Sequence, residues 1–221
     1  MSMIVLCPSR GRPDSAHQVQ QTFRDTSTGD TVLQFIVDED DETRFRYPMN
    51  TTLIKPQDGG MGLALNEGLK NFLGGFWMYG FVGDDHRFRT NGWDTTMMSA
   101  NIQKPGIYYA FDGVRADLPT NWFVDGAIVE SLGWLSLPSC KHFYLDDAWR
   151  ELGNQCGCLY YMGDITIEHL HYSYGKSKMD PTYERNLSNW QGGEDQRQYE
   201  DWRWGDGFRT DADLIRSVLP L

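Results

Sequence analysis

Short apolar runs alternate with amphipathic stretches along the first half of the chain. The apolar runs are residues 3–7, 33–37 and 76–82, with a shorter candidate at 53–54. Continuous apolar runs of this length are typical of strands buried on both faces. Residues 16–24 and 59–72 carry apolar side chains at helical spacing, and Asp14 or Ser15 can cap the first of these helices. The order strand, helix, strand, then strand, helix, strand predicts an α/β fold with a mostly parallel sheet flanked by helices.

The second half of the chain has a less regular pattern. Residues 107–111 and 165–169 are strand-like, and residues 146–153 predict a helix that ends at Gly153. Residues 128–133 fit either a short helix or a strand, closed in both cases by a glycine. The way these elements join the sheet stays open at this point.

The end of the chain differs in composition from the rest. From residue 181 onward the sequence is polar but retains the tryptophans Trp190, Trp202 and Trp204. Polar stretches with spaced aromatic residues are typical of surface helices that pack on a core. We therefore expect residues 1–180 to form one domain and residues 181–221 to form a polar, partly helical C-terminal extension packed on it.

Charge and composition narrow the class of protein. The 221 residues include 20 Lys and Arg against 31 Asp and Glu, a net charge of −11, which disfavours a protein that coats nucleic acid non-specifically. No apolar run approaches the roughly 20 residues of a membrane span, and residues 1–6 are too short and uncharged for a signal peptide. Four cysteines without a framework spacing indicate free thiols in a reducing compartment. We expect a soluble, cytoplasmic protein without a membrane partner.

Polar clusters follow three of the predicted strands at the point where each strand ends. They are Pro8, Ser9, Arg10 and Arg12 after the first strand, Asp38 after the second, and Asp84, Asp85 and His86 after the strand at 76–82. Ligands of parallel sheets bind beyond the carboxyl ends of the strands, so we expect these clusters to converge on one site. Arg10 and Arg12 can hold a phosphate or a ribose edge there, or simply be solvated. Asp38 is the first of five consecutive acids and the one held nearest to the strand end.

Two histidine-containing clusters predict a cation site. In extended backbone, residues two apart share a side, so Asp84 and His86 point the same way while Asp85 points away. A carboxylate together with an imidazole suits Mn²⁺ better than Mg²⁺, which prefers oxygen ligands alone. His169 and His171 form a second pair at the same spacing and can supply further ligands. The alternatives are a solvated acidic turn and structural histidines.

Two further motifs carry candidate charges for the same site. Lys176 and Lys178 can meet a diphosphate as point charges, or lie in a solvated loop. They do not indicate a nucleotide-triphosphatase, because Leu170 stands where such a loop requires glycine. Asp146 and Asp147 precede an amphipathic helix, where they serve either as acids at a helix N-terminus or as a general base for a hydroxyl group.

Taken in order, these motifs resemble the GT-A glycosyltransferases. The resemblance extends over residues 3–180 and is closest to family-2-like enzymes and their short bacteriophage versions. It implies a Rossmann-like GT-A sheet and transfer of a sugar from a nucleotide-diphosphate sugar, by preference a UDP-sugar, to an acceptor hydroxyl. It also implies that the nucleotide is held by the residues after the first two strands and in the glycine-led helix, namely Pro8, Ser9, Arg10, Arg12, Asp38 and Asn66.

The resemblance implies a metal site as well. In this family an Asp-x-Asp motif binds the ribose and a Mn²⁺ (or Mg²⁺) ion, and some GT-A families use Asp-x-His with a distant histidine instead. By that pattern Asp84, His86 and either His169 or His171 are the metal ligands, and Asp85 contacts the donor.

The resemblance further assigns a base and an acceptor side. A Glu-Asp pair whose Asp deprotonates the acceptor corresponds to Asp146-Asp147, with Asp147 the preferred base and Asp146 the reserve. The cation and Lys176 or Lys178 would stabilise the diphosphate as it leaves. The acceptor side is expected to include Trp93, Asp112, Trp122 and Trp134. The acceptor itself stays open; a phage-encoded enzyme could act in the host cytoplasm on a modified DNA base or on a protein.

Two other functions remain at this stage. A nucleotidyltransferase can share a similar sheet and metal, but it usually has a glycine-rich loop with Arg and Lys early in the chain, and residues 9–12 are too short for one. A non-catalytic carbohydrate- or partner-binding module that kept the scaffold would bind neither metal nor nucleotide.

Overall fold

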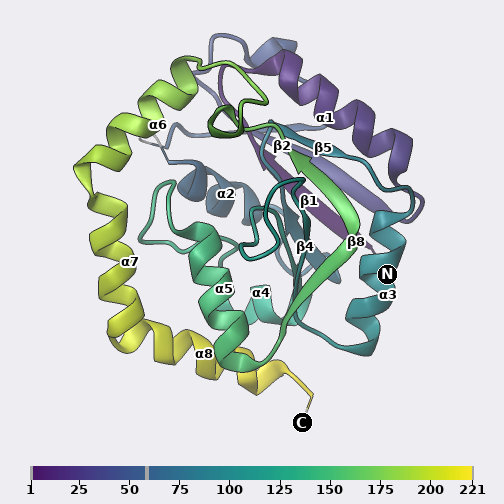
Figure 1. Ribbon diagram of the computed structural model, residues 1–221, viewed down its shortest axis with the longest axis vertical. Helices are drawn as coiled ribbons and strands as arrows, with labels where there is room; N and C mark the ends of the chain where they lie inside the picture. The colour runs from purple at the N-terminus through teal and green to yellow at the C-terminus, as the bar shows by residue number, and fades with distance from the viewer. Residues whose placement is uncertain (1, 58–59, 221) are drawn as a thin grey trace.

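The computed structural model describes residues 2–57 and 60–220 as one eight-stranded sheet with helices on both faces (Figure 1). In the order in which they are hydrogen-bonded, the strands are β3 (Thr51–Ile54), β2 (Thr31–Asp38), β1 (Met3–Pro8), β4 (Met78–Phe81), β7 (Trp122–Asp125), β6 (Ile107–Phe111), β8 (Leu159–His169) and β5 (His86–Phe88). The helices are α1 (Pro13–Thr26), α2 (Met61–Leu69), α3 (Trp93–Gln103), α4 (Gly126–Leu132), α5 (Leu145–Cys156), α6 (Pro181–Gly192), α7 (Glu194–Trp204) and α8 (Asp206–Val218), with 3-10 turns η1 (Arg44–Arg46) and η2 (Tyr172–Tyr174). The parallel pairs are β1–β2, β1–β4, β2–β3 and β6–β8, so the predicted mostly parallel α/β fold is confirmed.

Strand β1 lies inside the sheet and is buried on both sides. It pairs in parallel with β2 along one edge and with β4 along the other. Its alternate side chains enter different layers: Ile4 and Leu6 pack in one hydrophobic cluster, and Met3, Val5 and Cys7 in the other. The continuous apolar run is therefore explained, because a strand covered on both faces has no position left for a polar side chain.

Helices from both halves of the chain cover the two faces of the sheet. Helices α1 and α3 lie on one face, where Phe23 and Trp93 pack with Met3 (Figure 1). Helices α2, α4 and α5 lie on the other face, where Leu65 and Trp149 pack with Leu6. The carboxyl ends of β1, β2 and β4 stay uncovered by these layers, which leaves room there for a site.

Two short strands of the sheet carry no distinct sequence signal. Strand β7 inserts antiparallel between β4 and β6, and β5 pairs antiparallel with the end of β8. Each has only three or four residues, so its pattern cannot be separated from that of a loop. The residues after β4, which we expected to form a cation site, therefore lead directly into a strand, β5.

Helix boundaries differ from the expected ones in α1, α2 and α5; helix α2 ends at Leu69, so Phe72 lies beyond it. Helix α1 begins at Pro13, so Asp14 and Ser15 lie within its first turn rather than at its N-cap. Helix α5 continues past Gly153 and ends at Gly157, whose φ of 67° is the left-handed conformation typical of a helix C-terminus. Gly153 instead lies against β8, because a Cβ atom there would be 2.7 Å from the Cβ of Leu159.

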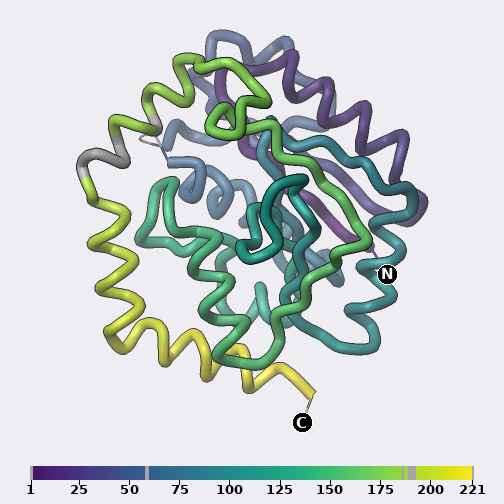
Figure 2. Tube along the Cα trace, viewed as in Figure 1, coloured from purple at the N-terminus to yellow at the C-terminus, as the bar shows by residue number. Residues whose placement is uncertain are grey.

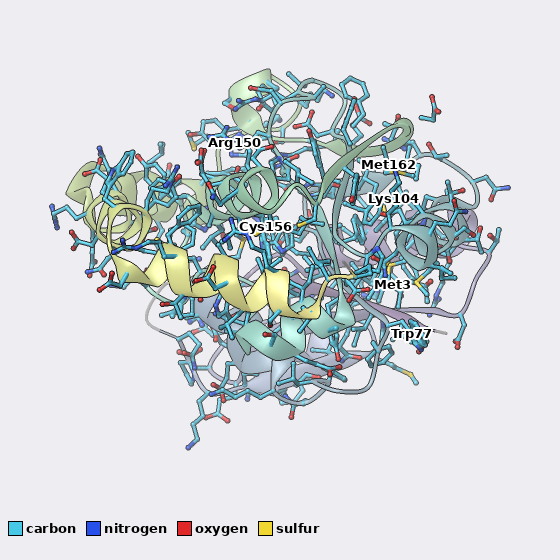
Figure 3. The ribbon with its side chains drawn as sticks, turned by 90° about the horizontal axis from the view of Figure 1, so that it is seen from below. Met3, Trp77, Lys104, Arg150, Cys156 and Met162 are labelled. Carbon is cyan, nitrogen blue, oxygen red and sulfur yellow. The ribbon has the colours of Figure 1, made fainter. Side chains whose placement is uncertain are left out.

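The predicted helical extension is present and packs on the body. Helices α6, α7 and α8 run one after another around the outside of the molecule (Figure 2). Seen from below, α8 lies across α4 and α5, and the Sγ atom of the labelled Cys156 is 3.5 Å from the carbonyl oxygen of Ala212 in α8 (Figure 3). Phe208 and Ile215 of α8 belong to the same hydrophobic cluster as Trp149 of α5.

Three smaller expectations concern cysteines, membrane spans and the undescribed positions. All four cysteines are free thiols. Among the described residues, no helix combines the length and the hydropathy that crossing a membrane requires. Gly59, expected at the start of α2, and the side chain of Trp190 lie outside what the structure describes.

Candidate active site

A cleft of about 910 Å³ opens at the carboxyl ends of β1, β2 and β4. Its walls include every residue of the three polar clusters that follow these strands: Pro8, Ser9, Arg10, Arg12, Asp38, Asp84, Asp85 and His86. The expected convergence is therefore confirmed. It follows from the parallel pairing, since parallel neighbours end at the same edge of a sheet.

Hydrogen bonds tie the loop after β1 to the two neighbouring strand ends. The Ser9 hydroxyl donates to Asp84 over 2.6 Å, and the Arg12 guanidinium donates to the other oxygen of the same carboxylate over 3.0 Å. Arg10 donates to Asp38 over 2.7 Å. Burial raises the pKa of Asp84 to about 6, although Arg12 acts in the opposite direction. One wall of the cleft is thus a pre-formed network of cations and carboxylates.

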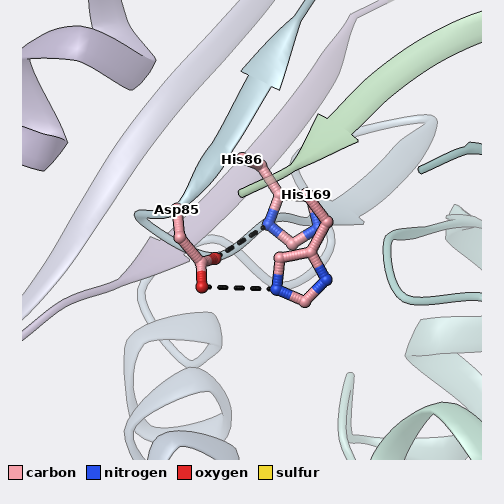
Figure 4. A group of neighbouring side chains, drawn as sticks. All are labelled: Asp85, His86 and His169. Atoms are coloured by element: carbon pink, nitrogen blue, oxygen red, sulfur yellow. Dashed lines mark hydrogen bonds and ion pairs between the residues drawn. The ribbon is translucent and has the colours of Figure 1, made fainter. Parts of the chain in front are cut away.

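Asp85, His86 and His169 form a compact cluster in the cleft (Figure 4). The two oxygens of Asp85 lie 3.3 Å from His86 Nδ1 and 3.3 Å from His169 Nε2. The two imidazole rings are stacked, with centroids 4.3 Å apart and planes inclined by 13°. Sheet pairing brings them together across more than eighty positions of sequence, because His86 in β5 lies directly opposite His169 in β8.

The orientation of the Asp84–Asp85 pair differs from the one we expected. Asp84 points towards Ser9 and Arg12, and Asp85 is the acid that joins the histidines. The reason is a tight turn: the His86 amide donates to the Gly83 carbonyl oxygen, so the backbone between them is not extended and the two-residue rule does not apply. The group of side chains gathered here is therefore Asp85, His86 and His169 rather than a set that contains Asp84.

The donor set of this cluster fits a divalent cation. One candidate ligand atom from each of Asp85, His86 and His169 lies within 4.8 Å of the other two. His86 Nε2 and His169 Nδ1 are buried and have no hydrogen-bond partner among the described residues, whereas His86 Nδ1 accepts from the Gly83 amide over 3.0 Å. One carboxylate with two imidazoles suits Mn²⁺ and related ions better than Mg²⁺.

The pKa values of Asp85, His86 and His169 are shifted in different directions. Burial works to raise the pKa of Asp85, but His169 and His86 hold that pKa well below its usual value. Burial and the nearby His169 lower the pKa of His86, whereas Asp85 raises the pKa of His169 against the effect of burial. These shifts favour an ionised Asp85 and a neutral His86, the forms that a metal ligand needs, whereas the raised pKa of His169 means that a cation would have to displace a proton there.

His171 lies beside the cluster without joining it. Its ring centroid is 5.2 Å from that of His169, and its Nδ1 atom is within hydrogen-bond distance of Ser173 Oγ at 2.7 Å. It still lines the cleft. The structure thus brings His169, and not His171, into the group around Asp85.

Asp146 and Asp147 face the same cleft from the first turn of α5. The Arg150 guanidinium donates to Asp147 over 2.5 Å and opposes burial, which raises the pKa of Asp147. Among the described residues, no cation is paired with Asp146, and burial together with the charge of Asp147 raises the pKa of Asp146 to about 6. The residue before α5, Tyr144, has φ of 66°, a strained conformation for a residue other than glycine, in the wall of the cleft.

Three other predicted residues do not line the cleft. Asn66 bonds the backbone of the loop after α4: its Oδ1 accepts from the amides of Leu135 and Ser136. Lys176 pairs with Glu168 over 2.9 Å and, together with Lys178, lines a neighbouring cavity of about 240 Å³. Asn66 therefore stabilises a loop, and the two lysines line the neighbouring cavity instead of the cleft.

The residues expected on the acceptor side lie mostly in the protein interior. Trp93 is fully buried under α1, with its ring centroid 6.0 Å from that of Phe23, and does not reach the cleft. Asp112 is also fully buried, and its carboxylate accepts from the amides that shape the following turn. Trp122 borders the cleft but is buried and stacks on Phe81. Trp134 packs on Trp149 in the core.

Several residues of the cleft were not expected from the sequence. Tyr183 of the C-terminal extension lines the cleft, while Asp180, just before the extension, and Asp195, within it, bond residues of the cleft walls. The Tyr183 hydroxyl donates to Asp85 over 2.8 Å, and Arg12 donates to Asp180 over 2.6 Å. Asp195 is buried and accepts from three consecutive amides of the loop that precedes α5, at residues 141–143. The one available signal was the sequence Asp180-Pro181, which is typical of a helix start.

Known structures with this fold identify the architecture. No protein-family model matches the chain, and no curated protein matches it significantly. Residues 1–349 of TarS from S. aureus in complex with UDP superpose with a TM-score of 0.57 at 13% identity, over 76% of this chain and 59% of that one. The mannosyltransferase PcManGT from Pyrobaculum calidifontis, bound to GDP-Man and Mn²⁺, gives a TM-score of 0.60 at 10% identity, over 97% of this chain and 74% of that one. A protein from Bacillus anthracis assigned as a glucose-1-phosphate thymidylyltransferase gives 0.52 at 12% identity, over 83% and 99% of the two chains.

These similarities define the fold. The chain has the architecture of the GT-A-type glycosyltransferases, as the order of its motifs implied. It spans about three fifths of the length of the TarS fragment that it matches. At 10–13% identity the likeness extends to the fold and not to the substrate.

Proposed function

We propose that this protein is a metal-dependent glycosyltransferase that moves a sugar from a nucleotide-diphosphate sugar to an acceptor hydroxyl. The observation that carries the proposal is that three groups of residues line one cleft. It combines the cationic loop after β1, the Asp85–His86–His169 cluster and an unpaired acid at the start of α5. The fold supports the same reading, since TarS was solved with UDP and UDP-GlcNAc, and PcManGT with GDP-Man and Mn²⁺.

The loop after β1 is suited to the nucleotide. Arg10 and Arg12 bring guanidinium groups to the ends of β1 and β2, each of them shared with two carboxylates, and Asp38 offers a carboxylate for ribose hydroxyls. Because these groups already bond one another, little ordering is required when a nucleotide binds. A UDP-sugar is our preferred donor.

Asp85, His86 and His169 would hold the divalent cation. When bound, such an ion neutralises the negative charge that develops on the diphosphate leaving group. The chain's own contribution is to keep the carboxylate ionised and the His86 ring neutral, as the pKa shifts of both groups favour. Arg12, adjacent to the cluster through Asp84, adds a second positive charge on the same side.

We assign the general base to Asp146 in preference to Asp147. A base must be ionised but not neutralised by a partner, and Asp147 is paired with Arg150. Asp146 has a pKa of about 6, close to the value at which a carboxylate can accept a proton near neutral pH. Asp146 lines the same cleft as the proposed donor and metal residues.

Ligand-induced stabilisation tests the proposal directly. We expect UDP with Mn²⁺ to raise the unfolding temperature by several degrees, because a ligand at 100 times its Kd stabilises a protein by about 2.7 kcal/mol. Asp85→Asn should lose the Mn²⁺-dependent part of this shift. Asp164→Asn, which removes an exposed acid of β8, is the matched control and should keep it. If no nucleoside diphosphate shifts the unfolding temperature with or without Mn²⁺, the glycosyltransferase proposal is wrong.

The product of the reaction separates this function from nucleotidyl transfer. The similarity to the assigned thymidylyltransferase keeps that alternative in view. A glycosyltransferase incubated with a UDP-sugar and Mn²⁺ releases UDP, even when water is the acceptor. A nucleotidyltransferase incubated with a nucleoside triphosphate and a sugar phosphate releases pyrophosphate. We expect UDP from the first mixture and no pyrophosphate from the second.

A further inference from the structure

Residues at the start of helix α6 form hydrogen bonds with Asp85 and Arg12, two charged residues of the cleft. Tyr183 is buried, and its hydroxyl donates to Asp85 Oδ2 over 2.8 Å. Asp180, three residues earlier, accepts from Arg12 over 2.6 Å, and the Arg12 guanidinium lies 4.1 Å above the centre of the Tyr183 ring. A segment outside the predicted domain of residues 1–180 therefore contacts the candidate metal ligand directly.

The position of Tyr183 is fixed from three sides. Asp180 caps α6, since its carboxylate accepts from the amides of Thr182 and Tyr183. The Thr182 hydroxyl donates to the carbonyl oxygen of Arg10 in the loop after β1. The ring of Tyr183 packs against His171 and Tyr172, with centroids 4.9 Å and 4.7 Å away. A hydroxyl held this firmly can in turn hold the group that it contacts.

Asp85 needs such a support. It projects from a tight turn, and its two oxygens contact His86 and His169 over 3.3 Å, a distance longer than a strong hydrogen bond. The contact from Tyr183 is the shortest that is described for this carboxylate. Carboxylates that ligate metals are commonly oriented by a hydrogen bond of this kind, and removing it weakens metal binding by about 10–100-fold.

We propose that Tyr183 is a positioning residue that orients Asp85 for the divalent cation and so couples the C-terminal extension to the metal site. The inference rests on the proposed function, because it assumes that Asp85, His86 and His169 hold a metal. Reciprocity then requires the converse effect: if docking of α6 favours metal binding, a bound metal favours docking of α6 by the same free energy.

Metal affinity of the full-length protein tests the proposal without any turnover assay. We expect Tyr183→Phe, which removes only the hydroxyl, to weaken Mn²⁺ binding by about 10–100-fold in calorimetry. Tyr172→Phe is the matched control, because Tyr172 packs in the same aromatic group without bonding Asp85, and it should bind Mn²⁺ as the wild type does. Unchanged affinity in Tyr183→Phe overturns the proposal. Tighter binding overturns it as well, because it would show that the hydroxyl obstructs the ion.

Hydrogen exchange supplies a second readout, which already tests the coupling in the wild type. There, Mn²⁺ should slow exchange at the backbone amides of residues 182–185, and in Tyr183→Phe this protection should shrink. Absence of protection in the wild type contradicts the coupling even if the variant does not fold. Binding of UDP without metal, measured on the same samples, separates the two proposals. If UDP binds and Mn²⁺ does not, Tyr183 has no metal to position, while nucleotide recognition in the proposed function stands.

Discussion

Neighbouring side chains at the end of β4 take different roles because the backbone turns between them. Asp84 faces the cationic loop after β1, while Asp85 faces the two imidazoles. Gly83 permits this turn, because a Cβ atom there would lie 2.7 Å from Asp85 Oδ1. Asp84 thus binds Arg12, and Asp85 belongs to the candidate metal cluster. A rule based on extended backbone selects the wrong one of the two.

The acid at the start of α5 gives a pH-dependent prediction. Because the pKa of Asp146 is raised to about 6, donor turnover should rise with pH through about 6 as the carboxylate ionises. Asp146→Asn should lower turnover by about 10²–10⁴-fold, the usual contribution of a general base. Asp147→Asn should keep a step but move it to lower pH, because the charge of Asp147 contributes to the raised pKa of Asp146. A step that survives in Asp146→Asn and disappears in Asp147→Asn would reverse the assignment.

Asp146 should also make folding stability depend on pH, but stability should fall with rising pH where turnover rises. A carboxyl group whose pKa is higher in the folded than in the unfolded protein makes folding less favourable as the pH rises between the two values. The folded value of Asp146 is about 6 and the ordinary value is 3.8. Asp146→Asn should therefore be more stable than the wild type above pH 6, and this gain should vanish below pH 3.8. Thermal unfolding of both proteins at several pH values measures it, and a pH-independent difference contradicts the raised pKa.

At the scale of elements, sequence patterns succeeded where burial is continuous or strongly one-sided. Strand β1 has no polar position, and α5 has a clear apolar face, so both were predicted. Helix α3 was missed because its buried residues, such as Trp93, Asp94 and Asn101, include polar ones and do not form an apolar stripe. Asp94 instead accepts from the amides of Thr28 and Gly29, a tertiary contact that local patterns do not reveal.

The predicted end of helix α5 at Gly153 was wrong, and a substitution there tests whether this glycine is needed for packing. In an exposed helix, replacing glycine with alanine stabilises by about 1 kcal/mol. At Gly153 we expect the opposite, a loss of about 1–3 kcal/mol, because the new Cβ would be 2.7 Å from Leu159 Cβ in the adjacent strand. Gly157→Asn is the control: φ there is 67°, which asparagine tolerates, and no atom lies within 4 Å. Denaturant unfolding compares them, and a stabilised Gly153→Ala would show that the glycine is not a packing requirement.

At the scale of the whole molecule, the candidate site is assembled from both predictable and unpredictable parts. The convergence of the strand ends at one edge could be predicted, because it depends on apolar runs that alternate with helices in a parallel sheet. The pairing of His86 with His169 could be proposed only as a hypothesis, since it depends on β5 and β8 meeting across the chain. The contributions of Tyr183 and Asp195 could not be predicted at all. No motif surrounds either residue, and their hydrogen bonds to Asp85 and to the loop before α5 form only when the extension packs on the body.

The extension therefore bears on how the chain folds, and we predict that it unfolds together with the body. Ile215 of α8 is fully buried in the cluster that contains Trp149, so Ile215→Ala should cost about 2–5 kcal/mol. The neighbouring Leu214 is exposed, and Leu214→Ala should change stability by less than about 0.5 kcal/mol. If residues 181–220 are integral, circular dichroism and tryptophan fluorescence of Ile215→Ala will report one coincident transition at a lower denaturant concentration. If they form an independent appendage, an early partial transition will appear while the rest of the molecule keeps the midpoint of the wild type. Because Asp195 holds the loop before Asp146, such early loss of the extension would also release the acid that we assign as the base.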